Sequence, residues 1–258
     1  MDPSFLPLFG LLVGMLIGLT GVGGGAILAP ILLILFQLEI ITVIAIDLAF
    51  SCITKSFSAV FHIRKKTIDW NIAKKLWMGS LPASLVVILF INKNPILVSG
   101  VITIALSCLI FVSGLILIFK NKIIKFLHNF FRFIKAKEDE NNLITTFFGS
   151  FIGVSVSATS VGAGAIGTAI LTILYPTKLN SYRLVGTDLM HAIPVSLIAG
   201  LTYFSFGTLD LSVLGALLIG SIPGVVIGSR VIFNFPQYFL RTIIGFALII
   251  SSIFLILF

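Results

Sequence analysis

The sequence predicts an all-α polytopic membrane protein with two inverted-topology repeats, each a broken glycine-rich helical hairpin plus three transmembrane helices. Three observations predict this fold: the apolar composition, an internal repeat, and the placement of the basic residues. Hydrophobic residues make up 58% of the 258 residues and charged residues 10%, whereas a soluble domain carries about 25% charged residues. Most of the exterior must therefore face lipid.

A glycine-rich stretch near the N-terminus recurs in the second half of the chain, 139 positions later. The identical pairs are Phe9/Phe148, Gly10/Gly149, Gly14/Gly153, Thr20/Thr159, Val22/Val161, Gly23/Gly162, Gly25/Gly164, Ala26/Ala165 and Ile27/Ile166. Further along, the offset grows to 141, where Asp47 matches Asp188. Such self-similarity marks a duplication. It divides the chain into a first membrane repeat (1–119), a basic and then acidic linker (120–142) and a second membrane repeat (143–258).

Three apolar runs in each half are long enough to cross a membrane as helices. They span residues 40–62, 70–92, 95–119, 184–204, 211–232 and 237–257. As one straight helix, the glycine-rich stretch 5–36 would be about 48 Å long, which exceeds a hydrocarbon core of about 30 Å, yet it is too short for two full spans. We therefore expect two shorter helices that fold back at Thr20–Gly25, and a second hairpin over 143–175 that breaks at Thr159–Gly164. Within the linker, Ile123–Phe133 has the pattern of a surface amphipathic helix.

The basic residues orient this arrangement, because cytoplasmic loops carry an excess of Lys and Arg. With two hairpins the halves have opposite orientations, and nearly all the basic loop residues then fall on the cytoplasmic side, while the outside receives only Lys93. We expect a multi-pass protein of a bacterial plasma (inner) membrane, with the linker cytoplasmic and both termini outside. The net charge of +8 follows from these loops rather than from a nucleic-acid-binding face.

The two glycine breaks are the candidate binding site. Unwound backbone at membrane depth is tolerated only against protein or a wet cavity, and the N-terminus of the helix after each break attracts anions. Close helix packing is the alternative explanation for glycine, and we prefer it for the GxxxG spacing of Gly10, Gly14 and Gly18. The predicted substrate-binding residues are Thr20, Gly21, Val22, Gly23, Gly24, Gly25, Lys55, Thr159, Ser160, Val161, Gly162, Ala163 and Gly164.

Charged residues within the spans are costly and often functional. Lys55 could balance an anionic substrate, and Asp47 or Asp188 could carry a coupling proton. The alternatives are that Lys55 is structural and that the aspartates cap helices or pair internally. His191, three residues after Asp188, could relay protons, although a hydrogen bond to Asp188 is the simpler prediction.

Two further acids, Asp69 and Asp210, each precede a predicted span. An acid in this position accepts hydrogen bonds from the first free N–H groups of the helix. We therefore expect both residues to cap the helices that follow them.

These motifs resemble the TauE/SafE family, the sulfite exporter family of membrane permeases. The resemblance covers nearly the whole chain and is carried by Gly14-x-x-x-Gly18-Leu19-Thr20-Gly21-Val22-Gly23-Gly24-Gly25, its second copy ending at Gly164, the Gly-Thr-hydrophobic-Asp element at Gly207–Asp210, and Gly-Ser-x-Pro at Gly79 and Gly220. It implies export or uptake of sulfite, organosulfonates, thiosulfate or related small anions. The acids Asp47 and Asp188 depart from the family's usual pattern.

We therefore expect a secondary transporter that binds a small anion at the membrane midplane, with a proton as the candidate coupling ion; a passive anion channel of the same fold is the alternative. No HExxH, GxSxG or paired catalytic acids are present, so we do not expect an enzyme. Cys52 and Cys108 lie in apolar runs and indicate neither a disulfide nor a metal site; no cofactor is expected. The predicted partners are the anion and the lipid bilayer, not nucleic acid, and a homodimer is one assembly that the sequence leaves open.

Overall fold

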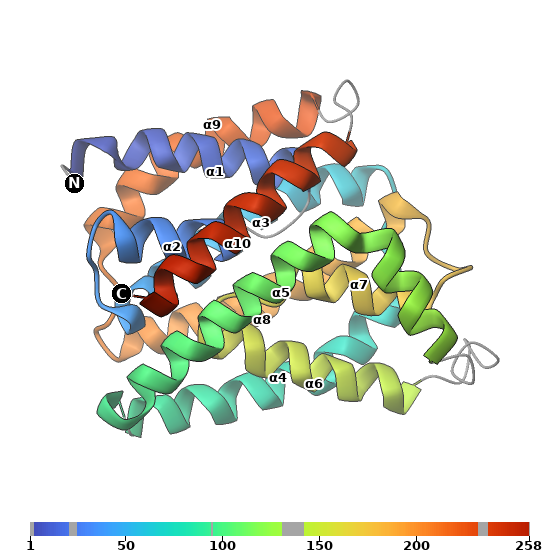
Figure 1. Ribbon diagram of the computed structural model, residues 1–258, viewed down its shortest axis with the longest axis horizontal. Helices are drawn as coiled ribbons and strands as arrows, with labels where there is room; N and C mark the ends of the chain where they lie inside the picture. Colours follow the sequence, from blue (N-terminus) through green and yellow to red (C-terminus); the bar gives the residue numbers. More distant parts are fainter. Residues whose placement is uncertain (1–2, 21–24, 94, 131–141, 232–236, 258) are drawn as a thin grey trace.

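The computed structural model describes residues 3–20, 25–93, 95–130, 142–231 and 237–257, and these parts of the chain are helical, with no strand among them (Figure 1). The elements are η1 (Pro3–Phe5), α1 (Leu6–Thr20), α2 (Gly25–Ile34), α3 (Ile40–Arg64), α4 (Trp70–Lys93), α5 (Pro95–Phe130), α6 (Asn142–Thr159), α7 (Ala165–Leu174), α8 (Ser181–Ser205), α9 (Leu211–Val231) and α10 (Gln237–Leu257). The predicted all-α fold is confirmed.

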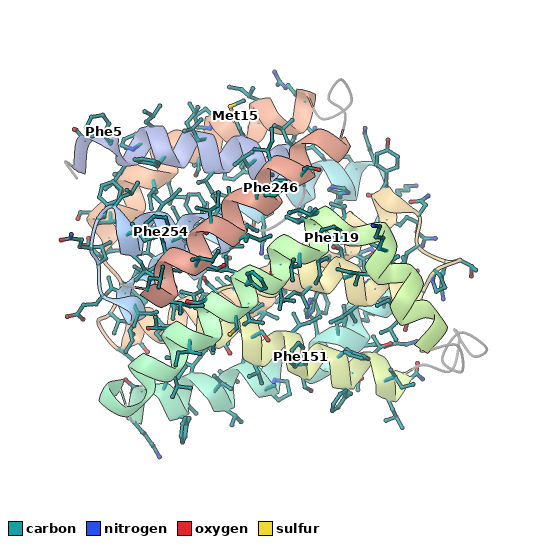
Figure 2. The ribbon with its side chains drawn as sticks, viewed as in Figure 1. Phe5, Met15, Phe119, Phe151, Phe246 and Phe254 are labelled. Carbon is teal, nitrogen blue, oxygen red and sulfur yellow. The ribbon has the colours of Figure 1, made fainter. Side chains whose placement is uncertain are left out.

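The helices have the length and the exterior of a multi-pass membrane protein. Within the described part of the chain, six helices are long and apolar enough to cross a bilayer. Five of them are predicted spans, and the sixth is α6, which was expected to be a shorter helix of the second hairpin; the predicted span 237–257 is represented by a shorter apolar helix, Thr242–Leu257. Large apolar side chains cover the outside: Phe5, Phe151 and Phe246, labelled in Figure 2, are about half exposed (46%, 49% and 55%). Soluble monomers do not expose apolar surface on this scale, so this exterior faces lipid.

Both glycine-rich stretches are divided where the sequence predicts. In the first stretch α1 ends at Thr20 and α2 begins at Gly25, while the intervening predicted site residues Gly21, Val22, Gly23 and Gly24 lie outside the described residues. In the second, α6 ends at Thr159 and α7 begins at Ala165. Between them Ser160, Gly162 and Gly164 have φ angles of 60°, 135° and 101°. Residues with positive φ cannot continue a right-handed helix, so the second break is a true interruption.

The two halves exchange their helices in packing. Helix α1 packs against α9, and its repeat counterpart α6 packs against α4, the counterpart of α9. The counterparts α3 and α8 pack against each other, as do α5 and α10. In Figure 1, α1 begins at the left beside the N-terminus and α6 begins at the right. A two-fold relation between the halves would produce this exchange; their opposite orientation in a membrane stays a prediction.

Glycines hold the α1–α9 and α4–α6 pairs at close range. A Cβ at Gly14 would strike the backbone of Ser221 in α9, and one at Gly153 in α6 would strike the backbone of Ser80 in α4. Gly10 and Gly18 meet the α9 backbone in the same way. The packing interpretation of the GxxxG glycines is confirmed.

Helix ends follow the sequence closely. The Oδ1 atom of Asp69 accepts a hydrogen bond from the backbone N–H of Ile72 (3.2 Å), and that of Asp210 accepts from the N–H of Val213 (3.2 Å), so both predicted caps are confirmed. Helix α5 continues beyond its predicted span, with a kink at Phe119 (φ −103°, ψ 20°) where the span was expected to end. The part after the kink reaches Phe130 and covers most of the amphipathic helix predicted in the linker.

Candidate functional site

Two central helices, α3 and α8, carry a cluster of buried polar and charged side chains. On α3, Asp47, Ser51 and Lys55 follow one another at four-residue spacing, which places them on one face of the helix. On α8, Asp188 and Ser196 are eight residues apart and also share a face. All five side chains are nearly inaccessible, with exposed fractions of 0–3%, and α3 packs directly against α8.

Asp188 closes the second glycine break. Its Oδ2 atom accepts a hydrogen bond from the backbone N–H of Gly164 (2.8 Å), the residue that caps the N-terminus of α7. A Cβ at Gly167, one turn into α7, would overlap the other carboxylate oxygen, so this glycine makes room for Asp188. A negative charge in this place is stabilised by the helix dipole. Asp188 therefore caps α7, one of the two roles that the sequence left open for it.

Asp47, the repeat counterpart of Asp188, meets the same break from the other central helix. The hydroxyl of Ser160 lies 2.5 Å from Asp47 Oδ2 and 2.6 Å from the carbonyl oxygen of Thr159. A serine hydroxyl has one hydrogen to donate, so it serves one of these acceptors at a time. Both repeat-mated acids thus converge on residues 160–164, which the sequence did not predict.

Lys55 completes the cluster. Its side chain is 3% exposed, and it interacts electrostatically with Asp188 and with Asp47. No hydrogen bond or ion pair of its ammonium group is found with the residues that the structure describes. If all three groups are charged, the cluster carries one net negative charge, which makes it a poor site for an anion until a proton is added.

Several polar atoms around this cluster have no hydrogen-bond partner among the residues that the structure describes. They are Asp47 Oδ1, Asp188 Oδ1, Ser51 Oγ and Ser196 Oγ. Buried polar atoms are nearly always paired with protein or water. A group of unpaired ones, beside a buried lysine and an interrupted helix, marks a place where a ligand, water or proton can be accommodated.

Other predicted site residues are placed as follows. The Thr159 hydroxyl lies 2.7 Å from the Ser155 carbonyl oxygen and also accepts a hydrogen bond from the Val161 N–H (3.2 Å), so it closes the end of α6. Gly162 is buried within the break and Ala163 is half-buried. Thr20 ends α1 and Gly25 begins α2, and the side chain of Thr20 lies outside the described residues.

The predicted hydrogen bond between His191 and Asp188 is wrong. His191 Nε2 pairs with Ser80 Oγ on α4 (3.0 Å), and its Nδ1 has no hydrogen-bond partner among the described residues. Three residues advance a helix by about 300°, so the two side chains diverge by about 60°, and the neighbouring α4 supplies a nearer partner. A proton-relay role for His191 stays an untested prediction.

Sequence reasoning missed Ser196, Gly167 and the contacts of Arg183. Ser196 could have been found, because adding the repeat offset of 141 to Lys55 gives this position. The Arg183 guanidinium contacts Asp69 Oδ2 at 3.1 Å, and Thr187 Oγ1 accepts from the Asp69 N–H at 3.0 Å. These bonds tie the start of α4 to the start of α8 and have no signal in local sequence.

A small cavity of about 80 Å³ lies near the ends of α1, α3 and α9 and the start of α8. It is lined by Gly18, Ser58, Phe61, His62, Lys65, Thr67, Tyr182 and Ser229. Ser58 is three residues after Lys55, so this cavity approaches the charged cluster along one face of α3.

Toward the other end of α8, the Tyr203 hydroxyl donates a hydrogen bond to the carbonyl oxygen of Ser157 (3.1 Å) in α6.

The chain is similar to known proteins over nearly its whole length. The sequence profile of the family described as "Sulfite exporter TauE/SafE" matches residues 6–255. "Probable membrane transporter protein YjnA" of Bacillus subtilis (strain 168) is 33% identical over 255 residues, covering 96% of this chain and 98% of that protein. "Probable membrane transporter protein YdhB" of the same organism is 24% identical over 237 residues, covering 90% and 91%. No solved structure matches the chain.

The profile spans nearly all the described helices, including both glycine breaks and both central helices. The YjnA relative covers almost the whole chain at 33% identity. A multi-pass helical fold with an apolar exterior agrees with what these relatives' names state. The chain therefore belongs to the TauE/SafE family of membrane transporters.

Proposed function

We propose that the protein is a secondary transporter that moves a small anion, of the class of sulfite, an organosulfonate or thiosulfate, across the plasma membrane with proton coupling. The observation that carries this proposal is a buried lysine, Lys55, that interacts electrostatically with two carboxylates, each hydrogen-bonded to a residue of a helix break. The family's printed description, sulfite exporter, supports the class of anion.

Anion binding is assigned to the break at residues 160–164. The first turn of α7 presents backbone N–H groups there, as helix N-termini do in many anion sites. When protonated, Lys55 adds a positive charge in a place from which water is largely excluded, where a charged hydrogen bond is stronger than in water. The equivalent break at Thr20–Gly25 is proposed as the other side of the site, because it repeats the same sequence pattern.

Proton coupling is assigned to Asp47 and Asp188. An acid that is buried in a span and has one unpaired oxygen can take up a proton without losing a second partner. Each protonation raises the charge of the cluster by one unit and so favours an anion. The cavity near Ser58 offers an approach from the face that we predict to be cytoplasmic.

A passive channel of the same fold remains the competing function, and the buried acids favour the transporter. A channel must let its ion leave at once, and it needs no titratable group at its centre. The proposal is tested with the purified protein in liposomes that contain no substrate. An inwardly directed proton gradient should accumulate radiolabelled thiosulfate or methanesulfonate above its external concentration. Uptake that only reaches equilibrium would favour the channel, and no uptake of any small anion would refute both.

A further inference from the structure

Asp188 occupies the place that the preceding proposal gives to the substrate. Its carboxylate accepts a hydrogen bond from the Gly164 N–H at the N-terminus of α7, and the absence of a side chain at Gly167 leaves room for this carboxylate. A carboxylate and a sulfonate or sulfite group offer the same chemistry to an amide: oxygen atoms that share a negative charge. While Asp188 is ionised, this amide is not available to a second anion.

We propose that Asp188 is a tethered competitor of the transported anion: it holds the Gly164 amide in the empty protein and releases it to the substrate on taking up a proton. This inference rests on the proposed anion transport and deepens it by naming the proton carrier and the group that is exchanged. It predicts that proton and anion bind together and therefore move in the same direction.

Three features of the cluster support the exchange. Asp188 Oδ1 is buried and has no hydrogen-bond partner in the described part of the chain, so a proton can be added there without breaking a hydrogen bond. Lys55 interacts electrostatically with Asp188, and once that carboxylate is neutral, the ammonium is available to the incoming anion. Among the described residues, Asp47 is hydrogen-bonded to the break through the Ser160 hydroxyl, which has the Thr159 carbonyl as a second acceptor. Asp47 therefore does not hold the Gly164 amide, and Asp188 can release this amide without any change at Asp47.

Among the residues that the structure describes, few titratable groups surround Asp188. Helix α3 contributes Lys55 and Asp47, and α8 itself contributes His191, which is held by Ser80 of α4. Asp69 at the start of α4 is already paired with Arg183. The described part of α7 has no titratable residue. Asp188 and its repeat counterpart Asp47 are therefore the acids whose titration the anion would sense most directly.

The test is isothermal titration of the purified full-length protein with thiosulfate and with methanesulfonate, whose charges stay constant from about pH 5 to pH 9. Repeating each titration in buffers of different ionisation enthalpy gives the number of protons taken up per anion bound. The wild type should take up one proton at Asp188, and its affinity should fall with rising pH, approaching tenfold per pH unit once Asp188 is ionised. Asp188→Asn should lose one proton of uptake and the corresponding slope, and should bind more tightly than the wild type at high pH.

Two comparison variants locate the effect. Asp47→Asn, at the same depth in the repeat-mated helix, should keep the proton uptake that belongs to Asp188. Asp210→Asn, at an exposed helix start, should behave as the wild type.

The outcomes separate this inference from the function beneath it. Binding of an anion without proton uptake and without pH dependence would overturn the exchange and leave anion transport standing, as would loss of uptake in Asp47→Asn but not in Asp188→Asn. Failure of the wild type to bind any anion across the pH range would overturn both. If Asp188→Asn does not fold, Asp47→Asn decides the question: proton uptake that persists in this variant supports the exchange at Asp188, and its loss overturns it.

Discussion

The position of the Asp188 carboxylate beside Gly167 of α7 can be tested by adding a side-chain atom at Gly167. In Gly167→Ala the added Cβ would overlap Asp188 Oδ1 and lie 3.2 Å from Asp188 Cγ. The carboxylate must then move away from the Gly164 amide, while the α7 backbone stays helical because Gly167 lies inside the helix. The substitution thus separates the position of Asp188 from its chemical identity.

The magnitude follows from two opposing effects. Alanine in place of glycine inside a helix stabilises by about 0.5–1 kcal/mol. Loss of a hydrogen bond to a charged group costs about 1.5–3 kcal/mol. Gly167→Ala should therefore lower the free energy of unfolding by about 0.5–2.5 kcal/mol in the wild-type background. In an Asp188→Ala background no carboxylate is present to be displaced, so the same change should stabilise by up to about 1 kcal/mol.

The assay is a double-mutant cycle of the four proteins, unfolded reversibly in mixed micelles at neutral pH and followed by tryptophan fluorescence. The cycle should give a coupling energy of about 1.5–3 kcal/mol between the two positions. If Gly167→Ala changes the free energy of unfolding equally in both backgrounds, the Asp188 carboxylate does not lie beside Gly167, and the geometry proposed for the site is wrong.

Three further predictions concern the rest of the molecule. Lys55→Met should weaken anion binding about tenfold or more, by loss of a buried charge-assisted contact. The free energy lost in anion binding should exceed the free energy lost in unfolding of the empty protein. An unchanged Kd would make Lys55 structural. Gly153→Ala, whose Cβ would strike the Ser80 backbone, should destabilise the protein by about 1–3 kcal/mol. The control Gly215→Ala has open space around it and should be neutral or stabilising by up to about 1 kcal/mol in the same unfolding assay. Similar losses of stability in both variants would refute the packing argument. Hydrogen bonds from the Ser212 side chain and from the backbone N–H groups of Val213 and Ser212 hold the pKa of Asp210 below its ordinary value. This cap therefore stabilises the fold at pH values above the ordinary carboxylate pKa, and it loses that effect as pH falls through the lowered pKa. Asp210→Asn should slightly flatten the acid side of the profile of stability against pH, and an unchanged profile would contradict this linkage.

The sequence was sufficient for the helices and for the positions of the breaks. Apolar runs of span length and the repeated glycines predicted helix ends that the structure places at Thr20, Gly25, Thr159 and Ala165. This succeeded because backbone chemistry is local: each glycine in a cluster disfavours a helix by about 0.5–1 kcal/mol relative to alanine, whatever surrounds it. The GxxxG glycines were assigned to packing for a similarly local reason.

The site itself could be predicted only in part. The repeat offset identified Asp47 and Asp188 as equivalent positions in the two halves. It could not show that both acids contact the same break, because that depends on how α3 and α8 pack against each other. His191 was assigned the wrong partner for the same reason, since the nearest acceptor comes from α4, over a hundred residues away in sequence. The role of Gly167 is visible only once Asp188 is placed beside it.

The most direct measurement is anomalous diffraction at the selenium edge from crystals of the protein grown at acidic pH with selenate, a heavier counterpart of the sulfur oxyanions. We predict a peak beside Lys55 at the N-terminus of α7, with the Asp188 side chain turned away from the Gly164 amide. A selenate bound elsewhere, while Asp188 still accepts the Gly164 N–H, would contradict the account.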